Sequence, residues 1–438
     1  MSGLSLPIVI LKQSGFWIFT HPFEAGVRFL FMGWGLALFL LGLKKRVEPL
    51  LLMPLGISMF LANAPGLHLA AYTCTVTTLA AAKSLGGLAN IVYLHNGLVK
   101  VCTPVRTAIL AWIFHYVVKT EIGPILIFFG IGALSDFRPM LSFPIASIVG
   151  AAAQLGIIVV SAIALSLGFP LGQAMAIGVV GGADGPTTIY TAINIAPELV
   201  GPLTIAVYSY IALIPVIQPP IARLLIPRRF RATKMPPPRK VDARTVILFW
   251  IVTIIAVAFL VPNALPLILA LAAGNIIREC GITEVVTRYG RTVSEALLDI
   301  ATILTMFGVG ATLSYDFLKQ FVYGSTASMV LFLERAFMAL GLGLLAFVIS
   351  TIGGIAFAWL LYFATKGRVN PLIGCAGVSA VPISARVAQR EASRVDPSTY
   401  ILYHALGPNV AGVIGTAIVA GVYIGAYHQI VSMLGAHP

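Results

Sequence analysis

Long apolar runs, separated by short polar stretches, fill most of the chain. Runs that predict membrane-spanning helices lie at about 27–43, 49–66, 122–135, 142–168, 199–226, 245–261, 264–278, 300–313, 337–365 and 399–427. Shorter or glycine-broken runs lie at 67–86, 170–195 and 369–389. The segment 283–298 instead places acidic and basic side chains at helical spacing, which predicts an amphipathic helix at the membrane interface. We therefore expect an all-α polytopic membrane protein.

The composition agrees with a membrane protein. Of the 438 residues, 59% are hydrophobic and 10% are charged, whereas soluble domains carry about 25% charged residues. The 28 Lys and Arg outnumber the 15 Asp and Glu. Cytoplasmic loops of membrane proteins collect basic residues. We therefore expect these basic residues in cytoplasmic loops of a protein that sits in membrane lipid, and we expect no nucleic acid partner.

The cysteines predict no covalent framework. Cys74, Cys102, Cys280 and Cys375 lie far apart, with no CxxC pair. This spacing indicates neither a zinc site nor a disulfide framework. The N-terminal residues also lack a short apolar core followed by a cleavage site, so we expect the first span to be retained.

Two basic loops indicate the orientation. "LKKRVE" at 43–48 and the segment 227–244, which holds seven basic residues, one acid and four prolines, are both expected on the cytoplasmic side. The second loop divides the chain. The expected organisation is an N-terminal segment 1–26, a first membrane half 27–226 with a broken helix near 170–195, a basic cytoplasmic linker 227–244, and a second membrane half 245–430 with a broken helix near 369–389.

Three motifs recur in the same order in the two halves. "GIGALSDF" (130–137), "AIGVVGGADGP" (176–186) and "YIALIP" (210–215) resemble "GVGATLSYDF" (308–317), "LIGCAGVSAVP" (372–382) and "YHALGP" (403–408). This order predicts two structural repeats, each with a glycine-broken discontinuous helix. We favour inverted repeats over parallel ones, because inversion creates a site at the midplane where two broken helices meet. Asp136 and Asp316 are equivalent in the two motifs and are expected to cap turns at the membrane surface.

The stretch "GGADGPTTIY" (181–190) places Asp184 within sequence that otherwise predicts membrane-buried chain. Glycine and proline in quick succession break a helix and leave backbone groups that lipid cannot satisfy. A carboxylate at mid-membrane depth costs roughly 2.5 kcal/mol or more. A bound cation or proton is therefore the favoured explanation for Asp184. The alternatives are that it caps a half-helix or pairs with Arg386.

The polar side chains of the broken segments carry mainly oxygen. They are Asp184, Thr187, Thr188 and Tyr190 in the first segment, and Asn370, Ser379, Ser384 and Arg386 in the second. A set rich in oxygen and poor in thiols suits Na⁺ or H⁺ better than zinc or copper. Tyr210 and Asn409 follow the two segments inside apolar spans, where a buried hydrogen bond is the alternative to a role as ligands.

Six segments carry a specific likeness to a known family: "KKRVEPLLLMPLGISMFLANAP", "GIGALSDF", "GGADGPT", "YSYIALIPVIQPPI", "NPLIGCAGVSAVPISARV" and "HALGPNVAGVIG". Between about residues 40 and 425, the chain closely resembles the β subunit of the sodium-pumping biotin-dependent decarboxylases. That family covers oxaloacetate, methylmalonyl-CoA, glutaconyl-CoA and malonate decarboxylases. The resemblance implies a carboxybiotin decarboxylase that couples the reaction to Na⁺ export and consumes a proton.

The resemblance also implies roles for single residues. Its motifs assign the sodium site to Asp184, Tyr210, Asn370, Ser379 and Asn409. They assign carboxybiotin binding to Arg386, with Ser384 beside it, and catalysis to Arg386, Asp184 and Tyr210. The stretch 67–120 departs from the family pattern, which leaves the partner contacts, and so the acid that is decarboxylated, open.

The implied partners are a biotin carrier protein, a carboxyltransferase subunit and a small membrane subunit, in an oligomeric complex of the bacterial inner membrane. The residues agree that biotin comes from elsewhere. A biotin-accepting lysine usually lies between two methionines, whereas Lys234 in "ATKMP" follows a threonine. Carboxybiotin is therefore expected on a partner protein.

One alternative function remains open at this point, a secondary Na⁺/carboxylate transporter of the elevator type, which would share the repeats and the acidic residue.

Arg386 lies four residues after Pro382, which places it about one helical turn after the break. There it is expected to pair with Asp184 in the absence of substrate and with the carboxyl group of carboxybiotin in its presence.

Overall fold

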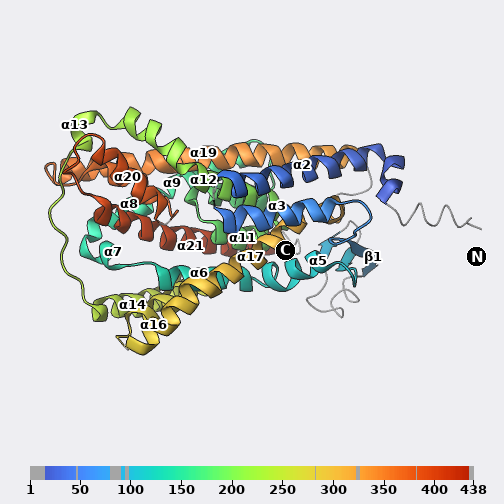
Figure 1. Ribbon diagram of the computed structural model, residues 1–438, viewed down its shortest axis with the longest axis horizontal. Coiled ribbons are helices and arrows are strands. Elements are labelled where there is room, and N and C mark those ends of the chain that lie inside the picture. Colours follow the sequence, from blue (N-terminus) through green and yellow to red (C-terminus); the bar gives the residue numbers. More distant parts are fainter. Residues whose placement is uncertain are drawn as a thin grey trace, which may run out of the picture.

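Helices make up nearly all of the structure, and the long ones run along one axis (Figure 1). This computed structural model describes residues 15–45, 48–78, 90–93, 98–281, 283–321, 326–380 and 382–433. Within these ranges, seven helices are long and apolar enough to cross a membrane, or eight if the bent pair Ile109–Val118 and Ile122–Leu134 counts as one span. The prediction of an all-α polytopic membrane protein is confirmed.

The elements of the first half, in chain order, are η1 (Gly15–Thr20), α2 (Pro22–Lys45), α3 (Pro49–Asn63), β1 (Tyr72–Thr78), β2 (Asn90–Tyr93), β3 (Leu98–Pro104), α5 (Ile109–Ile113), η4 (Phe114–Val118), α6 (Ile122–Leu134), α7 (Arg138–Ser142), α8 (Pro144–Ala152), α9 (Leu155–Ser166), α10 (Leu171–Val179), η5 (Val180–Gly182), α11 (Gly185–Ile195), η6 (Pro197–Leu199), α12 (Val200–Leu225) and α13 (Arg228–Arg231).

The elements of the second half are α14 (Ala243–Leu260), η7 (Pro262–Ala264), α15 (Leu265–Glu279), α16 (Thr283–Arg291), η8 (Thr292–Leu297), α17 (Leu298–Thr312), α18 (Tyr315–Leu318), α19 (Thr326–Ala364), η9 (Pro371–Gly377), α20 (Ile383–Ser393) and α21 (Leu402–Met433). The expected amphipathic helix over 283–298 is divided between α16, η8 and the first residue of α17. Helix α16 carries the charged residues Glu284, Arg288 and Arg291.

Three short strands form a sheet that the sequence did not predict. Strands β1 and β2 both pair antiparallel with β3. This register places Cys74 opposite Cys102, and the two form a disulfide. The expectation that no disulfide forms is therefore wrong, because the sheet brings together cysteines that lie 28 residues apart. Of the apolar run at 67–86, residues 79–86 lie outside the described part of the chain.

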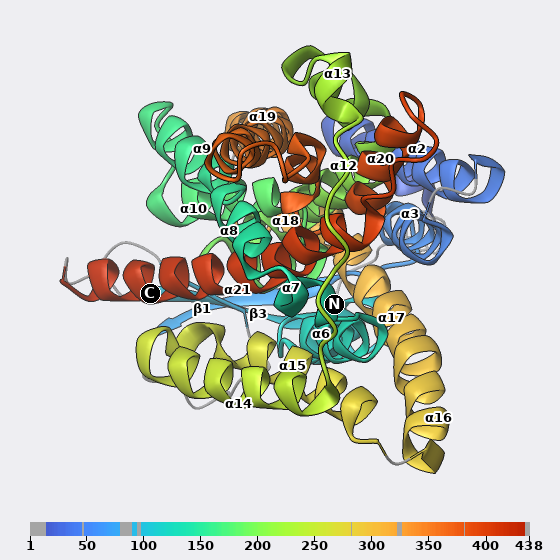
Figure 2. The ribbon, with the colours of Figure 1, turned by 90° about the vertical axis from the view of Figure 1, so that its left-hand side faces the viewer.

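The two ends of the bundle differ in chemistry. In Figure 1 the sheet lies at the right-hand end, and α13, α7 and α20 lie at the left-hand end. Figure 2 faces that left-hand end, where the basic linker crosses between α13 and α14. Disulfides persist in oxidising compartments, whereas basic loops collect in the cytoplasm. Both signals predict that the left-hand end faces the cytoplasm.

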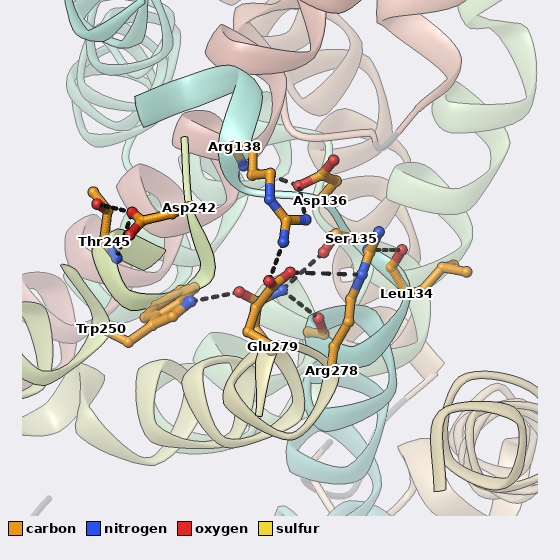
Figure 3. Close-up of polar contacts among 11 residues, drawn as sticks. Leu134, Ser135, Asp136, Arg138, Asp242, Thr245, Trp250, Arg278 and Glu279 are labelled. Atoms are coloured by element: carbon orange, nitrogen blue, oxygen red, sulfur yellow. Dashed lines mark hydrogen bonds and ion pairs between the residues drawn. The ribbon is translucent and has the colours of Figure 1, made fainter. Parts of the chain in front are cut away.

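Helix α15 of the second half packs against α6 of the first half, and an asparagine hydrogen-bonds across this contact. The Asn275 amide nitrogen donates hydrogen bonds to the carbonyl oxygens of Gly132 (3.0 Å) and Ser135 (2.8 Å), while Trp250 donates to its Oδ1 (2.8 Å). Arg138 forms an ion pair with Glu279 at the same junction (Figure 3). The backbone carbonyl groups at the end of α6 thus find their hydrogen-bond donors in the other half of the chain.

A similar junction joins α3 of the first half to α17 of the second. The Asn63 amide nitrogen donates to the carbonyl oxygen of Leu313 (2.7 Å), and the backbone N–H of Tyr315 donates to its Oδ1 (3.1 Å). Beside it, Asp316 accepts a hydrogen bond from Arg28 (2.7 Å). Asp316 is therefore an ion-pair partner and does not cap α18, whose N-cap is Ser314. Asp136 does accept from the backbone N–H of Arg138 (3.0 Å), as expected of a turn cap.

The two junctions support the predicted repeats, because Asn275 meets the end of "GIGALSDF" and Asn63 meets the end of "GVGATLSYDF". In Figure 1, α6 runs toward the left-hand end, where α7 lies, whereas α17 runs away from that end, where α16 lies. Opposite directions are what inverted repeats require. The repeat remains a prediction.

Candidate functional site

The first broken segment joins α10 to α11 through η5. Gly181 and Gly182 end η5, Ala183 adopts a left-handed backbone with φ of 53°, and Asp184 is the N-cap of α11. The Asp184 Oδ1 accepts a hydrogen bond from the backbone N–H of Thr187 (3.3 Å). Gly185 is required by packing, since a Cβ built there would lie 2.3 Å from the hydroxyl oxygen of Tyr208.

The second broken segment joins η9 to α20 and meets the first. The backbone N–H of Ser379 donates a hydrogen bond to the carbonyl oxygen of Gly182 (2.8 Å). A backbone carbonyl freed by the first break is thus satisfied by a backbone amide freed by the second. Broken helices are tolerated at membrane depth only when protein or a cavity covers their exposed backbone. Each break here covers part of the other.

A cavity of about 260 Å³ lies at this meeting point. Its wall includes Asp184 and Gly185 from the first break, Ser379 from the second, Tyr208 on α12, and Val413 on α21. Helices α3, α6 and α17 complete the wall. Both halves of the chain therefore contribute to one cavity around the Asp184 carboxylate.

Several buried oxygens at the two breaks have no hydrogen-bond partner. They are Asp184 Oδ2, Thr187 Oγ1, Ser379 Oγ and Asn409 Oδ1. The four residues are buried, with Asp184 6% exposed and Ser379 5% exposed. Leaving such groups unpaired costs about 1–3 kcal/mol each. A hard cation prefers oxygen ligands of these kinds, so the donor set fits a bound Na⁺.

The second break also holds an internal polar network. The Asn409 amide nitrogen donates to Ser384 Oγ (2.8 Å) and to the carbonyl oxygen of Val378 (2.8 Å). Ser384 in turn donates to Val378 (3.2 Å). These bonds fix the backbone next to Ser379 and leave Asn409 Oδ1 unpaired. The structure thus brings Ser379, Ser384 and Asn409 together.

Two of the expected site residues lie elsewhere. Asn370 caps η9, and its amide nitrogen donates to the linker carbonyls of Arg231 (3.0 Å) and Thr233 (2.8 Å). Tyr210 donates its hydroxyl hydrogen to the carbonyl oxygen of Leu340 on α19. Both polar groups have structural partners in this conformation. Neither residue lines the cavity around Asp184.

Sequence reasoning missed Tyr208, which does line the cavity and contacts Gly185. Both tyrosines belong to "YSYIAL", two residues apart on one helix. Residues two apart on a helix point in different directions, so only one of them can face Asp184. The sequence alone does not give the rotation of α12 about its axis.

Arg386 is the fourth residue of α20, one turn after the break, as expected. Its side chain is exposed, and within the described ranges it does not bond to Asp184, whose Oδ2 has no hydrogen-bond partner. The expected pairing of these two residues is therefore wrong for this conformation. Ile383 lines the cavity, and residues three apart share a helix face. Arg386 therefore lies on the same face of α20 as Ile383, one turn beyond the cavity wall.

Helix α20 is held in place by Glu391, which is fully buried. Its two oxygens accept hydrogen bonds from Arg223 on α12 (2.8 Å each), and Oε1 also accepts from Arg394 (2.6 Å). Burial alone raises the pKa of Glu391, but the hydrogen bonds and charges of Arg223 and Arg394 outweigh it and hold the pKa below its ordinary value. Glu391 therefore stays ionised and anchors the helix that carries Arg386.

Comparisons with known proteins agree closely with one another. A family model described as "Na+-transporting oxaloacetate decarboxylase beta subunit" matches residues 27–427. Oxaloacetate decarboxylase beta chain 2 of Salmonella typhi is 39% identical over 423 residues, covering 89% of this chain and 92% of the relative. Methylmalonyl-CoA decarboxylase subunit beta of Veillonella parvula is 37% identical, covering 94% and 95%. Glutaconyl-CoA decarboxylase subunit beta of Acidaminococcus fermentans matches equally well, with 37% identity and the same coverage.

The likeness extends over nearly the whole chain and includes both broken segments. It confirms the resemblance noted in the motifs, and it does not favour the transporter alternative. The chain belongs to the family of Na⁺-transporting oxaloacetate decarboxylase β subunits, and it is a multi-pass membrane subunit of a decarboxylase.

Proposed function

We propose that this subunit decarboxylates carboxybiotin presented by a partner protein and exports Na⁺ through a site that includes Asp184, Ser379 and Asn409. The observation that carries the proposal is the pair of unpartnered buried oxygens, Asp184 Oδ2 and Ser379 Oγ, on the wall of one cavity. These oxygens come from different halves of the chain. A cation between them would be bound by both breaks at once.

The charge of Asp184 suits a transported cation. Its carboxylate neutralises Na⁺ inside a region that disfavours a lone charge, while the hydroxyl and amide oxygens supply neutral ligands. No three His, Cys, Asp or Glu residues in the described chain are close enough to hold a metal ion. One carboxylate with neutral oxygens is a weaker set than a cluster of carboxylates, and weak binding favours release.

Arg386 is the proposed contact for carboxybiotin. A guanidinium offers a planar pair of donors that matches a carboxylate, and the Arg386 side chain is exposed. In the reaction the bond between the carboxyl carbon and the ureido nitrogen breaks, CO₂ leaves, and the nitrogen takes one proton from the aqueous phase. Loss of CO₂ removes the anion that Arg386 holds.

The partners follow from the same chemistry. The carboxyl group has to be transferred onto biotin by a carboxyltransferase and delivered by a biotin carrier, because Lys234 lacks the sequence of a biotin-accepting lysine. A small membrane subunit would complete the complex. Relatives that act on three different acids match at 37–39% identity, so we propose no particular acid.

The test uses the purified complex in proteoliposomes. Carboxylated biotin carrier is added, and CO₂ release and ²²Na⁺ uptake are measured with and without Na⁺. The proposal predicts CO₂ release that depends on Na⁺, together with Na⁺ uptake that depends on the carboxylated carrier. CO₂ release that is indifferent to Na⁺, or Na⁺ uptake driven by a free carboxylate without the carrier, would overturn it.

A further inference from the structure

The wall of the Asp184 cavity has a charge opposite to that of the chain. Three acidic residues, Glu48, Asp184 and Asp299, line it, and none of the lining residues in the described part of the chain is basic. The whole chain has 28 basic and 15 acidic residues. The excess of positive charge therefore lies elsewhere, and the cavity is the place where negative charge gathers.

Glu48 reaches the cavity from the turn between α2 and α3. It is the N-cap residue of α3, yet its side chain makes no capping hydrogen bond, and its backbone has φ of 38°, in the left-handed region. Such a conformation is uncommon for a residue with a side chain. Among the described residues, the Glu48 carboxylate forms no ion pair, and Leu51, one turn along the helix, also lines the cavity.

Asp299 reaches the cavity from the opposite half of the chain. It is the second residue of α17 and lies half-buried. Thr302, three residues later on the same helix face, lines the cavity as well. The structure shows no ion pair for Asp299 in the ranges that it describes. Its carboxylate and that of Glu48 are thus both left to face the cavity.

An independent observation points to a cation in this cavity. Asp184 Oδ2 and Ser379 Oγ are buried, line the cavity and lack any hydrogen-bond partner. We propose that Glu48 and Asp299 form an acidic entrance that concentrates Na⁺ in the cavity and passes it to the buried Asp184. The inference rests on the proposed function, because it takes Asp184 as the final ligand.

The three carboxylates act in series and do not bind one ion together. In the described chain no three acidic, histidine or cysteine side chains lie close enough to share a metal ion. Charges that line a cleft with low-dielectric walls focus the electric field and raise the local concentration of counter-ions. Glu48 and Asp299 would therefore change how readily Na⁺ reaches Asp184, and not the chemistry that follows.

The position of Glu48 indicates the side from which Na⁺ enters. Glu48 follows "LKKR", which is expected in the cytoplasm because of its basic residues. An entrance on this side fits export, since the cation must be collected from the cytoplasm. Lys44 is exposed and is not part of the cavity wall.

The test compares variants of the whole complex at low ionic strength. We expect Glu48→Gln with Asp299→Asn to raise the Na⁺ concentration for half-maximal CO₂ release about threefold to tenfold, while the rate at saturating Na⁺ stays within about twofold. Adding choline chloride should shrink the difference from wild type, because salt screens charges that act at a distance. Glu48→Asp with Asp299→Glu, which keeps both negative charges, should have the half-saturating Na⁺ concentration of the wild type.

The control is Glu284→Gln, which removes an exposed acid on α16 that lies outside the cavity wall, and it should leave the Na⁺ dependence unchanged. An unchanged half-saturating Na⁺ concentration in the double variant overturns the inference. So does a loss of rate that excess Na⁺ does not restore. Asp184→Asn separates the two proposals: if it abolishes Na⁺-dependent turnover while the double variant behaves as wild type, only the entrance is wrong.

Discussion

The backbone N–H of Ser379 donates a hydrogen bond to the carbonyl oxygen of Gly182 across 2.8 Å. These residues lie almost 200 positions apart, on the broken segments of the two halves. The bond means that a shift of one segment is transmitted directly to the other. Ligands contributed by both segments therefore keep their relative positions only while this contact persists.

Asp184→Asn should abolish Na⁺-stimulated decarboxylation while the subunit still assembles, because the amide keeps the shape and the capping acceptor but removes the charge that offsets the cation. Ser379→Ala should be milder, raising the half-saturating Na⁺ concentration about tenfold, which is about 1.4 kcal/mol. Steady-state CO₂ release against Na⁺ concentration measures both effects. Ser166→Ala, at an exposed hydroxyl of α9, serves as the control. Near-normal Na⁺ transport by a stable Asp184→Asn variant contradicts the sodium site.

Arg386→Lys should weaken the use of carboxybiotin far more than Na⁺ binding, since lysine keeps the charge but loses the planar pair of donors. The measurements are the KM for carboxylated carrier and ²²Na⁺ binding to the full-length subunit. Arg390→Lys, at an exposed position one turn along the same helix, should change neither. If Arg386→Ala decarboxylates normally and keeps its Na⁺ dependence, Arg386 has no role in the reaction.

Glu391→Gln should lower the free energy of unfolding by about 1–3 kcal/mol, because it removes the buried charge that pairs with Arg223, Arg394 and Arg231 (3.6 Å). The loss stays modest because Arg223 and Arg394 are half exposed. The pKa of Glu391 is depressed in the folded state, so its stabilisation is present above the unfolded value of about 4.3 and is lost as the pH falls through the folded value. As the pH is lowered below about 4.3, the Tm of the wild type should therefore fall more steeply than the Tm of the variant. Parallel curves in thermal melts would show that Glu391 does not supply this dependence.

Single cysteines near Arg138 and near Lys319 should react from opposite sides of the membrane, in a background without native cysteines. Arg138 lies on α7 beside the basic linker, to which Ser142 donates a hydrogen bond (2.7 Å to the Arg239 carbonyl). Lys319 lies beside the sheet, where Lys100 donates to its carbonyl oxygen (3.0 Å). Labelling of sealed vesicles with an impermeant maleimide decides the matter. Equal labelling from one side means parallel repeats.

Cys74 and Cys102 should be oxidised in the isolated protein and should react with maleimide only after reduction. Cys280, which is free and partly exposed, should react without reduction and so controls for reagent access. Replacing both paired cysteines by serine should destabilise the sheet by roughly 3–4 kcal/mol, given the length of the closed loop. If Cys74 reacts with maleimide without reductant, as Cys280 does, the disulfide is absent. The sheet is then not assigned to the oxidising side.

The sequence predicted what depends on local pattern. Glycine and proline around Asp184 imply a break wherever the segment lies, and the break is present. Pairing across space was not predictable. Cys74 and Cys102 carry no spacing signal, and Glu48 and Asp299 reach one cavity from helices that meet only in the folded chain.

Motifs alone also leave open the orientation of polar side chains. The resemblance assigns Asn370 to the sodium site, which stays a prediction, and in this structure its amide donates to the linker carbonyls. Tyr210 faces α19, whereas Tyr208 faces the cavity. A motif gives the residue types and their order, but the rotation of each helix is set by its packing against neighbours distant in sequence.

The crossed packing of the two halves also bears on how the protein is made. Helix α6 gains its α15 partner only when α15 has been synthesised, and the Asn63 amide, which also donates to Met59 in its own helix, gains its second acceptor only with Leu313. Chains emerge from the ribosome N-terminus first, so the first half spends part of translation in lipid with the α15-facing side of α6 uncovered. A fragment released at the basic linker would remain in that state. Quality-control proteases should degrade such a fragment, whereas separate expression of the missing half in the same cell should protect it.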